Sequence, residues 1–208
     1  MPVSRRRILL STVAVYATLT VIGVGWAAFR GRPQVLLYPE PWIALDAPWR
    51  HLASLAGGAL VAGITLGLTR LWVRRFRWAR RLHVSFREVL GALDRRTVLG
   101  VALASGIGEE VFFRGALQPS LGYVLTAILF GVVHVAPRKD LWPWTLWALV
   151  MGFVLGGLHA ATGSLLGPIV AHVWINYANL GFIVDHDPRA PQPDPSGAPR
   201  LVHRRERR

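Results

Sequence analysis

The sequence predicts an all-α protein, built as a polytopic bundle of about six transmembrane helices. Of its 208 residues, 52% are hydrophobic and only 17% are charged, whereas soluble domains carry about 25% charged residues. The apolar residues form runs of about 20, which is the length that crosses the hydrocarbon core of a bilayer. The basic residues gather at the ends of these runs, and this distribution indicates a membrane protein and no nucleic-acid partner.

Six segments are predicted to span the membrane, at residues 8–29, 52–73, 98–117, 121–136, 141–158 and 164–184. The first carries no charge and is longer than the apolar core of a signal peptide, so we interpret it as a retained anchor. The second and fifth contain the GxxxG patterns Gly63–Gly67 and Gly152–Gly156, which suit close contact between helices. For Gly63–Gly67, the plain enrichment of glycine in membrane helices is an equal alternative. The third, fourth and sixth contain ionisable or amide side chains.

The arginine distribution orients these spans. Nineteen of the 24 lysine and arginine residues lie in the N-terminus, in the turns after spans two and four, or in the tail, whereas the opposite side carries only Arg30, Arg32 and Arg50. The positive-inside rule therefore places both termini in the cytoplasm. The arginine bias is typical of a high-GC bacterium, so the expected location is a bacterial cytoplasmic membrane with anionic headgroups.

The chain is expected to form one membrane domain with three regions. Residues 1–97 form an N-terminal two-span region, in which the basic and aromatic segment 74–97 is predicted to be an amphipathic helix on the cytoplasmic surface. Residues 98–184 form the membrane core that carries the chemistry. Residues 185–208 form a basic, proline-rich tail that is expected to be disordered.

The third span contains three ionisable residues, each of which costs about 2.5–3.5 kcal/mol at the centre of a bilayer. Glu110 and Arg114 are four residues apart, so they share a helix face and are predicted to pair. Glu109 points about 100° away and lies outside that pair. A carboxylate at this depth suits a general base.

Three further polar residues lie in other spans: His134 in the fourth, and His172 and Asn176 one turn apart in the sixth. Together with Glu109 they lie roughly 12–20 Å below the outer ends of their spans. A cluster at one depth needs mutual hydrogen bonding to be tolerated in a membrane. Such a set suits hydrolysis of an amide, with or without zinc, because zinc also accepts carboxylate and imidazole ligands. Cysteine is absent, which excludes thiol chemistry.

These residues fall into the motifs EExxxR at 109–114, FxxxH at 130–134 and HxxxN at 172–176. In this order on successive spans, they resemble the CPBP family of intramembrane proteases, which comprises CAAX proteases and bacteriocin-processing enzymes and is also called the Abi family. The resemblance covers residues 100–181. It implies an endopeptidase, of glutamic type or a metalloendopeptidase, that cleaves near the C-terminus of a membrane-associated or lipidated protein or peptide.

The resemblance also implies roles for the motif residues. Glu109 and His134 would activate water, and His172 and Asn176 would stabilise the oxyanion. The residues that would support this site are Glu110, Arg114 and Phe130. The resemblance favours a mechanism without a cofactor, and it leaves open a zinc ion held by Glu109, His134 and His172.

Two other functions stay open on the sequence. One is a non-enzymatic membrane scaffold or immunity protein that keeps the fold. The other is a proton-coupled transporter, because buried glutamate, arginine and histidine also mark proton paths. Transporters of this kind usually contain inverted repeats, and no internal repeat is visible in the sequence.

Overall fold

Helices make up the regular structure of residues 5–91 and 93–189, the ranges that this computed structural model describes. The elements in chain order are α1 (Arg5–Phe29), α2 (Ala47–Arg75), α3 (Arg77–Leu90), α4 (Arg95–Glu109), the π-helix η1 (Glu110–Leu117), α5 (Gln118–Leu121), α6 (Tyr123–Val133), the 3-10 helix η2 (Lys139–Leu141), α7 (Trp142–Thr162) and α8 (Leu166–Asp185). The only pairing of β type in these ranges is an isolated bridge between Leu37 and Ser164. The predicted all-α bundle is confirmed.

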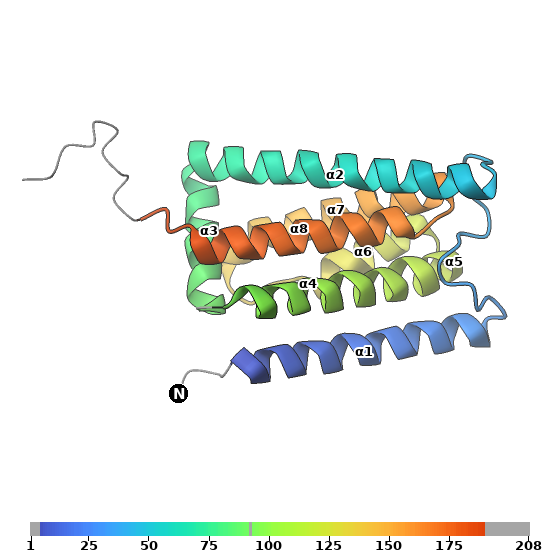
Figure 1. The fold of residues 1–208 in the computed structure, drawn as a ribbon, viewed down its shortest axis with the longest axis horizontal. Helices are drawn as coiled ribbons and strands as arrows, with labels where there is room; N and C mark the ends of the chain where they lie inside the picture. Colours follow the sequence, from blue (N-terminus) through green and yellow to red (C-terminus); the bar gives the residue numbers. More distant parts are fainter. Residues whose placement is uncertain (1–4, 92, 190–208) are drawn as a thin grey trace, which may run out of the picture.

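The long helices run side by side, and α3 lies across one end of the bundle (Figure 1). The helix predicted between spans two and three is therefore present, but it covers Arg77–Leu90 and not the whole of 74–97. Gly91 ends it with a φ of 64°, and Asp94 starts the next helix by accepting a hydrogen bond from Thr97 N at 2.8 Å. Glycine and aspartate are favoured at these two helix ends.

Three helical segments in the described ranges are long and apolar enough to cross a membrane: Arg5–Phe29, Ala47–Arg75 and Lys139–Thr162. The fourth predicted span is a shorter apolar helix, Tyr123–Val133. The third and sixth predicted spans, α4 with η1 and α8, are not among the three, since their ionisable and amide side chains lower their hydropathy. They run within the same bundle (Figure 1). The protein is an integral membrane protein.

Two clusters of apolar side chains hold the inner helices together. One joins α2, α7 and α8 through Ala62, Met151, Leu155, Ala171 and Ile175. The other joins η1, α6 and α7 through Phe113, Phe130 and Ala148. Both clusters border the polar residues of the third span, so the side chains that pack the bundle also surround these polar residues.

The two predicted GxxxG contacts have different outcomes. A Cβ at Gly152 would lie 2.8 Å from Ala127 O, and one at Gly156 would lie 2.9 Å from Gln118 Oε1, so this pattern does bring helices together. Among the described residues nothing lies within 4 Å of a Cβ at Gly63 or Gly67, so that pair makes no close contact here and agrees with the alternative, plain glycine enrichment. The close contact of α2 uses a residue one to two turns earlier, Gly58, where a Cβ would overlap the Gly167 backbone of α8.

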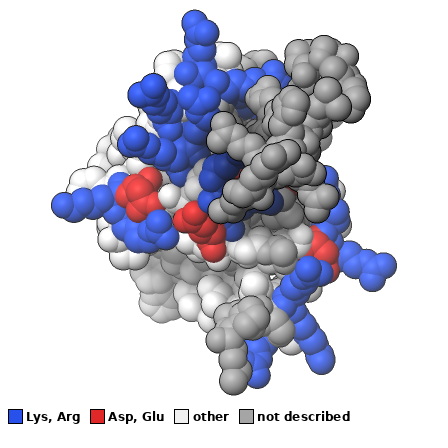
Figure 2. Space-filling model, turned by 90° about the vertical axis from the view of Figure 1, so that its left-hand side faces the viewer, with Lys and Arg blue, Asp and Glu red and all other residues white. Residues whose placement is uncertain are grey.

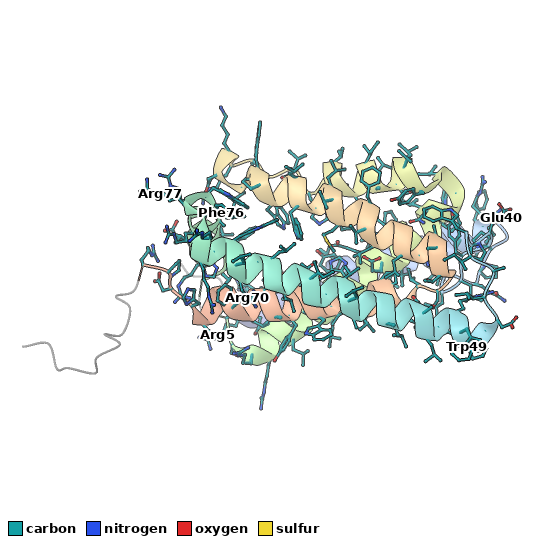
Figure 3. The ribbon with its side chains drawn as sticks, turned by 90° about the horizontal axis from the view of Figure 1, so that it is seen from above. Arg5, Glu40, Trp49, Arg70, Phe76 and Arg77 are labelled. Atoms are coloured by element: carbon teal, nitrogen blue, oxygen red, sulfur yellow. The ribbon has the colours of Figure 1, made fainter. Side chains whose placement is uncertain are left out.

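The end of the bundle at α3 is strongly basic. Figure 2 views the molecule from this end and shows lysine and arginine side chains clustered there. Figure 3 shows Arg5, Arg70 and Arg77 toward this end, and Glu40 and Trp49 at the other. The described chain ends, at the start of α1 and after α8, lie at this same end (Figure 1). The predicted disorder of the tail concerns residues that, from 190 onward, lie outside the described ranges.

Candidate active site

The two adjacent glutamates lie where an α-helix becomes a π-helix. The α4 helix ends at Glu109, and the wider turns of η1 begin at Glu110 and close with a hydrogen bond from Gln118 N to Phe113 O, five residues back. The predicted span at 98–117 is therefore helical but not uniformly α-helical. Single π-turns inside α-helices occur often at functional sites.

Glu110 is fully buried and forms the predicted ion pair with Arg114, with 3.0 Å between Glu110 Oε1 and Arg114 Nη1. The same Glu110 oxygen lies 2.7 Å from His172 Nδ1. Arg114 also points toward the carbonyl oxygens of Met151 and Gly152 at 3.4 Å, and its guanidinium lies over the Phe130 ring at 4.1 Å. The ion pair thus connects η1 to α6, α7 and α8.

His134 occupies the C-cap of α6 and not the interior of a span. Its Nδ1 lies 2.6 Å from Phe130 O, and its ring lies between the rings of Phe130 and Trp144, with centroid distances of 4.5 and 5.2 Å. Thr145 donates a hydrogen bond to His134 O at 2.8 Å. A carbonyl oxygen only accepts, so Nδ1 carries the proton and Nε2 is the nitrogen left for chemistry.

Glu109 lies between the two histidines. Its Oε2 atom is 3.6 Å from His134 Nε2 and 3.9 Å from His172 Nε2. Glu109 is buried, and this oxygen has no hydrogen-bond partner among the described residues. A buried carboxylate oxygen that faces two imidazole nitrogens is well placed to share a water molecule with them.

Asn176 lies one turn after His172 on α8. Its Nδ2 donates to Ser105 Oγ at 2.9 Å, and that hydroxyl in turn donates to Val101 O at 2.8 Å. The Ser105 hydroxyl has one proton, and it donates that proton to Val101 O. Toward Asn176 the hydroxyl can therefore only accept, so it fixes the side of the carboxamide that carries Nδ2.

All four predicted catalytic residues line one cavity of about 1490 Å³. Glu109, His134, His172 and Asn176 are among its polar lining residues. Its remaining walls are largely aromatic and aliphatic, and the α3 residues Trp78, Leu82, His83 and Phe86 line it too. The cavity therefore reaches from the buried polar cluster to the basic end of the bundle.

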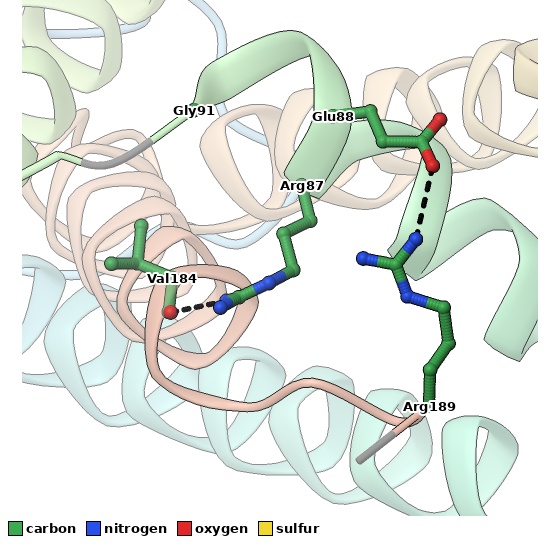
Figure 4. A pocket seen from close by; sticks show the side chains of 5 residues that line it. All are labelled: Arg87, Glu88, Gly91, Val184 and Arg189. Atoms are coloured by element: carbon green, nitrogen blue, oxygen red, sulfur yellow. Dashed lines mark hydrogen bonds and ion pairs between the residues drawn. The ribbon is translucent and has the colours of Figure 1, made fainter.

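A second, smaller pocket of about 290 Å³ lies where α3 meets the end of α8 (Figure 4). Arg87 donates there to Ile183 O at 2.8 Å and to Val184 O, and Arg189 donates to Glu88 Oε1 at 3.1 Å. These bonds attach α3 to α8. They lie apart from the four predicted catalytic residues and support the position of α3 over the cavity.

The alternative that the sequence leaves open is a zinc ion held by Glu109, His134 and His172. Zinc binds such groups at about 2.0–2.2 Å in a tetrahedral arrangement. Across residues 5–91 and 93–189, no group of three or more histidine, aspartate or glutamate side chains is arranged to hold a metal ion. Glu109 Oε2 lies 3.6 and 3.9 Å from the two Nε2 atoms, so a zinc ion held by Glu109, His134 and His172 stays a prediction.

Two residues of this site have no part in the motifs. Ser105 lies four residues before Glu109, so helical spacing alone places it on the same face, and that signal could have identified it. Tyr16 of α1 also lines the cavity. It lies in a different span with no pattern that connects it to Glu109, so only the tertiary structure brings it to the site.

Comparison with known proteins supports the motif pattern. Residues 94–178 match the family described as Rce1-like, type II CAAX prenyl endopeptidase. Over 81 residues the chain is 31% identical to the uncharacterized protein YpbD of Bacillus subtilis (strain 168). That alignment covers 38% of this chain and 41% of YpbD, so less than half of the relative is matched. No solved structure matches. The family resemblance of the three motifs is confirmed.

Proposed function

We propose that this membrane protein, whose residues 94–178 match the Rce1-like family, is an endopeptidase that hydrolyses a peptide bond inside the cavity. The observation that supports this most is the position of Glu109 Oε2, within 4 Å of an imidazole nitrogen from each of two other helices. Hydrolysis needs a base that holds water beside donors for the oxyanion. The four cavity residues supply both.

Glu109 is the proposed base. A water molecule between Glu109 Oε2 and His134 Nε2 gives one proton to the carboxylate as its oxygen attacks the scissile carbonyl carbon. The resulting tetrahedral intermediate collapses when the bond between carbon and nitrogen breaks. The proton held by Glu109 then passes to the leaving amine, so the carboxylate is restored for the next turnover.

Asn176 and His172 are the proposed oxyanion donors. Asn176 Nδ2 has a second proton beyond the one directed to Ser105. His172 directs Nδ1 to Glu110, so it can donate from Nε2 only as an imidazolium. A site that uses both donors therefore needs a protonated His172 when the intermediate forms.

The proposed substrate is the C-terminal segment of a membrane protein or membrane-bound peptide. The cavity has apolar walls and extends to the basic end that α3 covers, which the arginine distribution places in the cytoplasm. An apolar or lipidated segment can enter such a cavity without losing its membrane environment. Anionic headgroups would gather around the exposed arginines of α3.

The proposed mechanism uses no metal ion. We expect purified protein to retain its peptidase activity after dialysis against a strong chelator, and to contain much less than one zinc ion per chain by elemental analysis. Stoichiometric zinc, with activity lost on chelation and regained on adding zinc, would overturn this part of the proposal.

The function is tested with purified protein in bilayer nanodiscs and two quenched fluorescent peptides. One carries a farnesylated cysteine four residues from its C-terminus, and the other is the same peptide without lipid. Cleavage of either peptide between internal residues supports the endopeptidase, and their ratio reports whether lipid is recognised. In cells, C-terminal peptide mapping of membrane proteins from a deletion strain should show uncleaved C-termini. No cleavage in either experiment would contradict the proposal.

A further inference from the structure

The first helix reaches the candidate active site although it lies outside the segment that matches the family. That segment covers residues 94–178, and α1 ends at Phe29. Most of α1 is exposed, and within its span only Gly23 and Ala27 are buried. Yet two of its residues, Tyr16 and Leu19, line the cavity that contains Glu109.

The approach of α1 depends on a glycine directly before Glu109. A Cβ at Gly108 would lie 2.9 Å from both Tyr16 Cβ and Tyr16 O. Real Cβ atoms essentially never come so close to backbone, so a larger residue at this position would push α1 away. The missing side chain at Gly108 thus brings the Tyr16 ring to the side of Glu109.

Tyr16 and Glu109 line the same cavity, and Tyr16 packs against Gly108, directly before Glu109, so the phenol and the carboxylate are neighbours. A phenol next to an ionised carboxylate donates its proton. Glu109 Oε2 has no partner among the described residues, and it faces His134 and His172. A donor from α1 would restrict rotation of the carboxylate and keep this oxygen directed at the two imidazoles.

We infer that Tyr16 is a positioning residue for Glu109, supplied by a helix that the catalytic motifs do not include. The inference rests on the proposed function, in which Glu109 is the base. Tyr16 holds the carboxylate in the orientation that serves the water. Loss of the hydroxyl should therefore lower turnover while leaving the apolar walls of the cavity unchanged.

The test compares Tyr16→Phe with the matched variant Tyr123→Phe. Tyr123 also has a hydroxyl that donates within the bundle, to Phe153 O at 3.0 Å, but it does not line the cavity. We expect kcat of Tyr16→Phe on the quenched peptide to fall about tenfold to a hundredfold with little change in KM, the effect of losing a hydrogen bond to a charged group. Tyr123→Phe should keep the wild-type kcat.

Infrared spectroscopy gives a readout that separates positioning from a purely structural role and needs no substrate. The carboxyl stretching band that vanishes in Glu109→Gln belongs to Glu109, and its frequency should shift in Tyr16→Phe, which removes a hydrogen-bond donor, and stay unchanged in Tyr123→Phe. An unshifted band in a folded Tyr16→Phe protein would overturn the inference, as would unchanged kcat. If Glu109→Gln itself retains turnover, the proposed base fails, and the infrared result still decides whether Tyr16 contacts Glu109.

Discussion

Glu110 Oε1 accepts from two side chains at once, His172 Nδ1 at 2.7 Å and Arg114 Nη1 at 3.0 Å. The second glutamate therefore does more than neutralise a buried arginine. It joins η1 to α8 and determines which nitrogen of His172 faces Glu109. Because Nδ1 is directed to Glu110, the reacting nitrogen of His172 is Nε2, as it is for His134.

Glu110→Ala should destabilise the protein strongly. It leaves Arg114, which is only 1% exposed, without its carboxylate partner, and breaking a buried ion pair costs about 3–5 kcal/mol. Thermal unfolding in mild detergent should show a large decrease in midpoint together with lost activity. Glu40→Ala, at an exposed glutamate at the other end of the bundle, is the control. Full expression and full activity of Glu110→Ala would count against the role of the pair.

Ser105→Ala should reduce kcat with little effect on KM, because Asn176 loses the acceptor that orients its carboxamide. A single oxyanion donor is worth about 10²–10³ in kcat, so we expect a smaller, roughly tenfold loss from misorientation. Ser120→Ala is the matched control, since that hydroxyl likewise accepts from a side chain and donates to a carbonyl four residues back. Equal kcat values for the two variants would show that Ser105 does not orient Asn176.

The docking of α3 should depend on pH through His83. This side chain is 4% exposed, and its burial lowers the pKa of the imidazole, which a hydrogen bond to His186 O partly offsets. The other groups that act on it are the cations Arg87 and Arg70 and the His186 ring. Below about pH 6.5, the His83 imidazole binds a proton more readily in the unfolded state than in the folded state. The free energy of unfolding therefore decreases as the pH falls.

Hydrogen exchange measures this effect directly. After correction for the intrinsic rate, the amides of α3 should exchange faster at about pH 5.5 than at about pH 7.5. In His83→Gln the difference should disappear. Exchange of α3 that does not change with pH in the wild-type protein would contradict this account.

The sequence predicted the features that depend on local pattern. Apolar runs identified the helices, and alternating basic residues with aromatic ones identified α3, because both signals follow from partition between lipid and water. Spacing of four residues identified the pair of Glu110 with Arg114, since it reflects the helical repeat. The motif residues Glu109, His134 and His172 are found close together, although their roles stay proposals.

The features that the sequence could not predict depend on tertiary packing. The π-helix η1 and the C-cap position of His134 were not predicted, because an apolar run shows neither the pitch of a helix nor the residue at which it ends. Gly63 and Gly67 have the same spacing as Gly152 and Gly156, yet only the second pair meets a neighbour. The approach of Tyr16 to Glu109 joins residues that are far apart in the chain, so no spacing indicates it.

The turnover of Glu109→Gln tests the central claim most directly. The change keeps the size of the side chain and removes the base, so we expect cleavage of the quenched peptide to fall by about 10²–10⁴ while the protein inserts and unfolds like the wild type. Glu40→Gln, assayed in parallel, should cleave at the wild-type rate. Turnover by folded Glu109→Gln equal to that of the wild-type protein would contradict the claim that this carboxylate activates the water.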